Sequence, residues 1–157
     1  DPPEGPIRNI AEFERMHGVL IRYPLGISTS LIREMAEDVI VYCLVSSSLQ
    51  NSAYNSMNNA GVNMNNVEFI LDSTDSYWTR DYGPWWVVDG NNDVSVVDHT
   101  YNRPRPNDNQ APLKLSNYLD TLPAPLSVVH YQLQIGVGLQ TRVRDPLFDR
   151  WNHGWLW

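Results

Sequence analysis

The stretch VIVYCLV at residues 39–45 decides the fold, because it contains no charged residue and no glycine or proline. A strand with one face in water alternates polar and apolar side chains, whereas a strand covered on both faces is apolar throughout. Residues 39–45 therefore predict a buried strand in a sheet that is covered on both sides.

Two further buried strands are predicted on either side of this one along the chain, at Gly18–Tyr23 and Val67–Leu71. A helix separates each pair of strands. Ser28–Asp38 has a hydroxyl cap followed by apolar residues at helical spacing, and Ser47–Ala60 is a polar helix that stops at Gly61. The order strand, helix, strand, helix, strand predicts an α/β fold.

The middle of the chain reads as a loop followed by a hairpin. Residues 72–83 are rich in Ser, Thr and Asp and are expected to form a loop. Pro84–Asp89 and Val94–His99 then flank Gly-Asn-Asn-Asp at residues 90–93, a composition that favours a hairpin turn.

The last third of the chain gives weaker patterns. A polar, proline-rich loop at residues 101–112 leads into a predicted helix at Leu113–Leu122. Ser127–Leu139 is a candidate strand, whereas Arg142–Trp157 has no clear period. We expect this tryptophan-rich tail to be poorly ordered or loosely packed.

The composition excludes several classes of protein. Of 157 residues, 42% are hydrophobic and 11% aromatic, which is enough for a folded core. The formal net charge of −7, without a basic stripe, argues against nucleic-acid binding. No apolar run reaches the length of a membrane span. The chain begins at Asp1 without a methionine, so a processed or cut N-terminus is expected.

The chemistry is expected in the loop around Asp81. The two carboxylate oxygens of Asp81 can accept paired N–H bonds from a guanidinium, and Trp78 can cover its flat face. Alternatively, Asp81 caps a turn beside Arg80 and the tryptophans belong to the core. Residue pattern alone does not decide between these interpretations, although loop acids more commonly cap turns.

The segment WTRDYGP at residues 78–84 resembles the Trp-x-Arg-Asp-x-Gly-Pro motif of agmatine deiminases and Porphyromonas-type peptidylarginine deiminases. Residues 18–23, 67–73 and 101–106 resemble the peptidylarginine branch in order and spacing. The resemblance covers about residues 2–123.

This resemblance implies an α/β fold of the pentein type, a five-bladed pseudo-symmetric propeller of which about two blades are expected in this chain. Residues 1–124 would then be the N-terminal part of a deiminase catalytic domain. Residues 125–157 resemble nothing in the family and are expected to be divergent or out of frame.

The resemblance also implies an activity. Family members hydrolyse the guanidinium of arginine to a ureido group and release ammonia, without a cofactor. A cysteine thiolate forms a thiouronium intermediate, a histidine acts as general acid and base, and two acids hold the guanidinium.

Four residues of this chain match substrate-binding positions of the family. Asp81 matches the first guanidinium-binding acid and Trp78 a wall of the pocket. Arg103 and Arg105 match arginines that bind the main-chain carbonyl or terminal carboxylate of the substrate. Without the family resemblance, the residue pattern alone would predict that these arginines are solvated surface residues or form a helix-to-loop ion pair. Arg80 is interpreted as a structural ion-pair partner.

No residue matches the nucleophile or the general acid and base. Cys43, the one cysteine, lies in the apolar stretch 39–45, where a thiol is inert, and it excludes both an internal disulfide and a cysteine-based metal site. None of the four histidines has Asp two residues later, and His99 is interpreted as a half-buried strand residue. This polypeptide alone is therefore expected to be inactive.

Three functions remain open. The chain is part of a secreted or cell-surface bacterial peptidylarginine deiminase, part of an agmatine deiminase, or a non-catalytic arginine-binding fragment. Arg103 and Arg105 favour the first, because agmatine has no carboxylate for an arginine to bind. The expected partners are peptides with arginine, C-terminal arginine in particular, and the full-length protein is expected to be monomeric.

Overall fold

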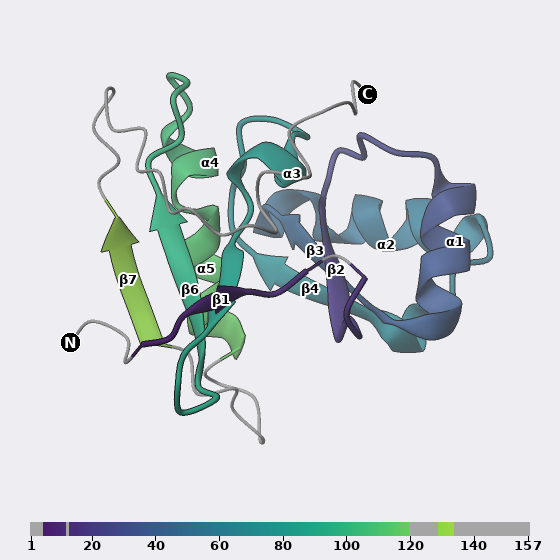
Figure 1. Ribbon diagram of the computed structural model, residues 1–157. Helices are drawn as coiled ribbons and strands as arrows, with labels where there is room; N and C mark the ends of the chain where they lie inside the picture. Colours follow the sequence, from purple (N-terminus) through teal and green to yellow (C-terminus); the bar gives the residue numbers. More distant parts are fainter. Residues whose placement is uncertain (1–4, 12, 120–128, 134–157) are drawn as a thin grey trace, which may run out of the picture.

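The computed structural model describes residues 5–11, 13–119 and 129–133, which form two sheets with helices packed on them (Figure 1). The element order combines strands and helices along the chain, so the α/β prediction is confirmed. No helix within these ranges is long and apolar enough to cross a membrane.

The first sheet is parallel and has the strand order β2-β3-β4. Its strands are Gly18–Arg22, Ile40–Val45 and Val67–Leu71. Parallel neighbours require crossover connections. These contain α1 (Thr29–Asp38) and α2 (Gln50–Asn59), which occupy the same end of the molecule in Figure 1.

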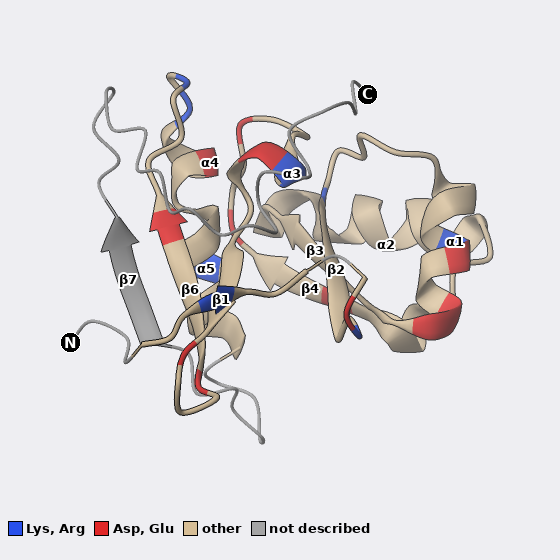
Figure 2. Ribbon diagram, in the orientation of Figure 1, with Lys and Arg blue, Asp and Glu red and all other residues tan. Residues whose placement is uncertain are grey.

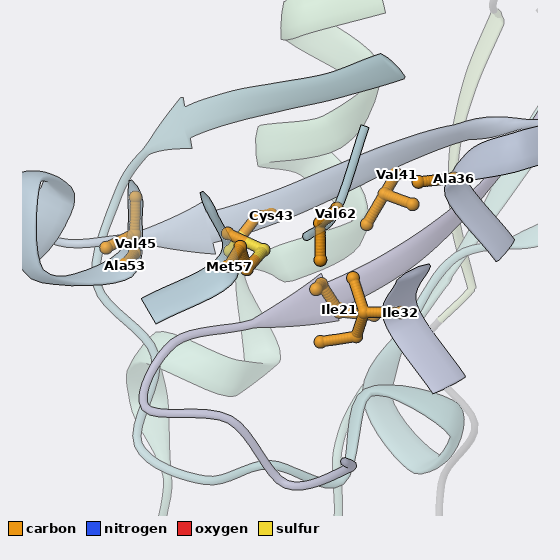
Figure 3. Close-up of a cluster of buried hydrophobic side chains, with 9 residues drawn as sticks. All are labelled: Ile21, Ile32, Ala36, Val41, Cys43, Val45, Ala53, Met57 and Val62. Carbon is orange, nitrogen blue, oxygen red and sulfur yellow. The ribbon is translucent and has the colours of Figure 1, made fainter. Parts of the chain in front are cut away.

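The predicted double burial of β3 is confirmed, because its side chains alternate between two cores. Val41, Cys43 and Val45 pack with residues of α1 and α2, as Figure 3 shows. Tyr42 and Leu44 face the opposite core. That second core includes residues of α3 and α5, namely Tyr82, Ala111, Leu115 and Leu119. A strand between two apolar layers has no place for a charged side chain.

The second sheet is mixed and has the order β1-β5-β6-β7. Its strands are Arg8–Asn9, Trp85–Val88, Val94–His99 and Val129–Leu133. β5 pairs antiparallel with both β1 and β6, whereas β6 pairs parallel with β7. The helix α5 (Ala111–Leu119) contacts both β6 and β4, and so links the two sheets.

The predicted hairpin is present, and its turn is built by Asp89. The Oδ1 atom of Asp89 accepts the backbone N–H groups of Asn91 at 2.8 Å and Asp93 at 2.9 Å. Asn92 takes a positive φ of 68° within this turn, a conformation that asparagine tolerates. Gly61, where the sequence predicts that the helix at residues 47–60 ends, follows α2 and has a φ of 77°.

Two predicted loops are wrong in part, because each contains a short helix. Residues 72–83 include α3 (Thr79–Tyr82), and residues 101–112 include α4 (Pro106–Asn109) and the start of α5. Pro106 opens α4, where its missing N–H costs nothing. The polar helix expected at residues 47–60 also begins as a separate turn, η1 (Ser47–Leu49).

Several bounds shift by one or a few residues, and a further turn, η2 (Met64–Asn66), precedes β4. Of the candidate strand at residues 127–139, the structure describes Val129–Leu133 as β7. The predictions for residues 120–122 of the expected helix, and for the tail at 142–157, lie outside the described residues.

Candidate substrate-binding site

The helix α3 places Asp81 on the surface because its neighbour Tyr82 is buried. Tyr82 is 1% exposed and its hydroxyl donates to the backbone carbonyl of Ser76 at 2.7 Å. Burial, with the nearby charge of Asp108, raises the pKa of Tyr82 well above its ordinary value. Side chains of adjacent helical residues point in different directions. Asp81 is accordingly exposed.

A buried carboxylate, Asp108 of α4, fixes the loop that leads into α3. Asp108 is 0% exposed. Its Oδ1 accepts the backbone N–H of Asp75 at 2.7 Å and that of Ser76 at 3.1 Å. Its Oδ2 accepts the hydroxyl of Ser76 at 2.6 Å. Buried carboxylates are tolerated when hydrogen bonds replace the lost water, and these bonds fix the direction of the chain.

Asp75 of the same loop forms a second set of hydrogen bonds with α4. Its carboxylate accepts the backbone N–H of Asn107 at 2.9 Å and the side-chain amide of Asn107 at 2.7 Å. Partial burial raises the pKa of Asp75, but these hydrogen bonds outweigh burial and the net shift is downward. Because the pKa of Asp75 is lower in the folded protein than its unfolded value of about 3.9, ionised Asp75 contributes to stability above that pH. This contribution is lost as the pH falls through the folded-state pKa.

Two basic side chains hold the same loop from other elements. Arg22, at the end of β2, donates from Nε to the hydroxyl of Thr74 at 2.8 Å and from Nη2 to its carbonyl at 3.1 Å. Lys114 of α5 donates to the carbonyl of Ser73 at 2.8 Å and pairs with Asp72 at 3.1 Å. The loop before α3 is therefore held by side chains from β2, α4 and α5.

Gly83 ends α3 because its backbone runs against the helix. A Cβ atom at Gly83 would lie 2.4 Å from the carbonyl oxygen of Thr79, closer than any side chain permits. The N–H of Gly83 donates to that same oxygen at 2.8 Å. Pro84 follows and cannot continue a helix. The Gly-Pro pair thus turns the chain from α3 into β5.

The four predicted substrate-binding residues differ in their settings. Asp81 and Arg103 are exposed, and neither side chain has a partner among the described residues. Trp78 is 46% exposed and packs on Tyr77 at a ring distance of 4.7 Å. Arg105 is half-buried and donates to the Tyr101 hydroxyl at 3.4 Å. Their roles in binding stay predictions.

The structure brings these residues to one end of the molecule without direct pairing. Asp81 forms no ion pair with either arginine in the described structure. The link is indirect, since the ring of Tyr82 packs edge-on against Tyr101 at 5.7 Å. Figure 2 shows the charged α3 at the same end as α4 and the loop before it.

His99 is the site residue that sequence reasoning missed. Its Nε2 lies 3.2 Å from the backbone carbonyl of Asp81, and its ring packs on Trp85 at 5.1 Å. It ends β6 and is half-buried, in accord with its interpretation as a strand histidine. Its partners lie 18 and 14 positions earlier in the chain, and only the sheet brings them together.

A cavity with a volume of about 760 Å³ lies beside this site. Thr79 and Arg80 of the motif and Trp85 of β5 line it. His17 and Tyr42 also line it, and their side chains approach to 3.1 Å. Asp81 and Trp78 are not among its lining residues. The carboxylate of Asp81 is therefore exposed at the surface and not enclosed in this cavity.

The structure supplies no reactive thiol or metal site in the described ranges. Cys43 is 0% exposed, and burial raises its pKa to about 12, against a smaller opposing effect of Arg22. A thiol with that pKa is not a nucleophile at neutral pH. No group of His, Cys, Asp and Glu within residues 5–11, 13–119 and 129–133 could hold a metal ion. Among the described residues, the candidate site therefore contains no thiol available for covalent catalysis.

The fold just described is that of known deiminases, over part of their length. No family model matches the chain. A crystal structure provisionally named a peptidyl-arginine deiminase matches with a TM-score of 0.60 and 23% identity, over 82% of this chain and 42% of that one. The agmatine deiminase of Enterococcus faecalis matches with a TM-score of 0.62 and 16% identity, over 81% of this chain and 38% of that enzyme.

A protein from Porphyromonas gingivalis, provisionally named an arginine deiminase, matches with a TM-score of 0.60 at 8% identity, over 77% of this chain and 39% of that one. The chain thus spans about two-fifths of the length of the structures it matches. At these identities the likeness establishes a shared α/β fold. The five-bladed propeller and its blade count stay predictions.

The buried carboxylate gives a stability test. We expect Asp108→Ala to lower the free energy of unfolding by about 2–4 kcal/mol, because three donors lose their acceptor. Asp72→Ala, which removes a half-exposed carboxylate from the same loop, is expected to cost about 1 kcal/mol or less. Urea denaturation measures both. Equal losses would contradict the role given to Asp108.

Proposed function

We propose that this chain is part of a guanidino-group deiminase and that Asp81 and Trp78 bind the guanidinium of the substrate. The observation that carries the proposal is an exposed carboxylate without a side-chain partner among the described residues, three positions from an exposed indole. A guanidinium offers paired donors to such a carboxylate and a flat face to the indole. The likeness in fold to agmatine and peptidyl-arginine deiminases supports the proposal.

In the complete enzyme, the proposed reaction converts peptidyl-arginine and water to peptidyl-citrulline and ammonia. A cysteine thiolate bonds to the guanidinium carbon, a histidine protonates the departing ammonia, and water then cleaves the carbon–sulfur bond to regenerate the thiol. This scheme uses no cofactor. Within it, the contribution of this chain is substrate binding, since Cys43 is buried and inert.

Arginine in peptides is the substrate that the loop before α4 favours. Arg105 is partly ordered by Tyr101, whereas Arg103 is exposed, and both carry a forked donor suited to a carboxylate or carbonyl. A peptide with C-terminal arginine would offer both groups. Agmatine offers neither, so an agmatine deiminase is the second candidate. A non-catalytic arginine-binding module is the third.

The localisation, partners and oligomeric state that we propose follow from the same resemblance. We place it outside a bacterial cell, secreted or at the cell surface, with arginine-containing peptides or proteins as partners and a monomeric full-length form. The net charge of −7 suits cationic peptides better than nucleic acid.

The first test removes the charge of Asp81. NMR titration with agmatine should shift the amide signals of residues 79–83. The affinity should be weaker than millimolar, because an exposed ion pair is worth about 1 kcal/mol and a Kd of 1 mM requires about 4 kcal/mol. Asp81→Asn should weaken this binding about fivefold. Asp38→Asn removes an equal charge from the exposed end of α1 and should change little. Comparable losses in both variants would indicate only a net-charge effect.

A second test separates peptide from amine substrates. Arg103→Ala and Arg105→Ala should weaken binding of N-acetylarginine, which has a carboxylate, several-fold and leave agmatine binding unchanged or slightly stronger. Arg33→Ala on α1, an exposed arginine paired with Glu34, serves as the control. An equal loss for both ligands would mean that the loop supports the fold and does not read the carboxylate.

A third test concerns chemistry. This polypeptide alone should release no ammonia above the buffer control from peptidyl-arginine or agmatine, because its one thiol is buried. Cys43→Ala should behave identically. A ureido product that depends on Cys43 would overturn the assignment of this thiol to the core.

A further inference from the structure

We infer that His99 is a positioning residue that holds the main chain of Asp81 and thereby presents its carboxylate to a guanidinium. The inference rests on the proposed function of Asp81 and deepens it. Its starting point is the 3.2 Å contact between Nε2 of His99 and the carbonyl oxygen of Asp81.

The contact fixes which ring nitrogen carries hydrogen. A backbone carbonyl can only accept, so Nε2 must be the donor. The carbonyls in the last turn of a helix have no partner within it, and a histidine from elsewhere can satisfy them. In the four-residue α3, every residue belongs to such a turn. His99 therefore caps the carboxyl end of α3 from β6.

The ring is itself held by the segment that it caps. Trp85 follows Asp81 by four residues and packs on His99 at 5.1 Å with an interplanar angle of 35°. Trp85 also pairs with Val97 of β6 in the sheet. The side chain of His99 thus contacts both Asp81 and Trp85, and it fixes the turn at Gly83 between them. The Nδ1 atom of His99 is buried without a partner in the described structure, so the ring is held through Nε2 and its faces.

This arrangement suits a binding acid. The side chain of Asp81 has no partner among the described residues, so its position depends on its main chain. A short helix held by few internal bonds frays unless its end is capped. Holding the main chain while leaving the carboxylate open lowers the entropy cost of binding a ligand. His99 thus acts on the ligand through Asp81.

Two variants separate the donor from the ring. His99→Phe keeps a flat ring against Trp85 but removes the donor, whereas His99→Gln places an amide N–H near the position of Nε2. In the NMR titration with agmatine, we expect His99→Phe to weaken binding at least threefold. His99→Gln should stay within twofold of the parent. N-Carbamoylputrescine, which has a neutral ureido group in place of the guanidinium of agmatine, should not bind measurably to any variant.

A double-mutant cycle tests whether His99 acts through Asp81. In the Asp81→Asn background, His99→Phe should cause no further loss of agmatine binding. Thermal unfolding of each variant establishes that the titration is run on folded protein.

The inference is overturned by parent-like binding of His99→Phe, by an equal loss in His99→Gln, or by a further loss in the double variant. If Asp81→Asn itself binds agmatine as the parent does, the proposed function fails instead. The two failures are therefore distinguishable.

Discussion

The site depends on one buried charge, the carboxylate of Asp108. Removing a carboxylate from water is costly, and the cost is offset here by N–H and O–H donors from Asp75 and Ser76. Meeting that demand fixes the loop between β4 and α3. The carbonyl of Ser76 then receives the Tyr82 hydroxyl, which orients α3 and leaves Asp81 at the surface. The position of Asp81 thus depends on the hydrogen bonds that the buried carboxylate of Asp108 accepts.

The two cores support this arrangement in different ways. The core beneath α1 and α2 includes β3 residues such as Val41 and Cys43, and none of the four predicted substrate-binding residues is among its described members. The core on the opposite face contains Tyr82 and Tyr101, whose rings meet between α3 and the loop of Arg105. The core packed under α1 and α2 and the core that supports the candidate site therefore lie on opposite faces of the β2-β3-β4 sheet.

The first half of the fold could be predicted because it follows from periodicity within single segments. The apolar run 39–45 is too short for a typical helix and predicts a covered strand, which the structure has at Ile40–Val45. The predicted bounds of Val67–Leu71 agree with those of β4. The helices α3 and α4 were missed because each has four residues, too few for a period, and tertiary hydrogen bonds hold them. The order of the second sheet was also out of reach, since β1 pairs with a strand about 80 residues away.

For the site, family resemblance nominated Asp81 and Trp78, and geometry supplied their surroundings. Nothing in the sequence distinguishes Asp108 from other loop acids, because its burial arises from the packing of α4. His99 was interpreted as an ordinary strand histidine for the same reason. Local patterns report what a segment does by itself, whereas these two residues act on segments distant in sequence.

The mutual hold between Asp75 and Asn107, beside that between Asp108 and Ser76, also constrains how this protein can change over evolution. Each pair joins positions more than 30 residues apart. Loss of Asp108 or Ser76 would leave a buried polar group without its partner, so we expect single replacements there to be tolerated less well than paired ones. Related sequences should show these positions varying together or not at all, whatever substrate they have come to use.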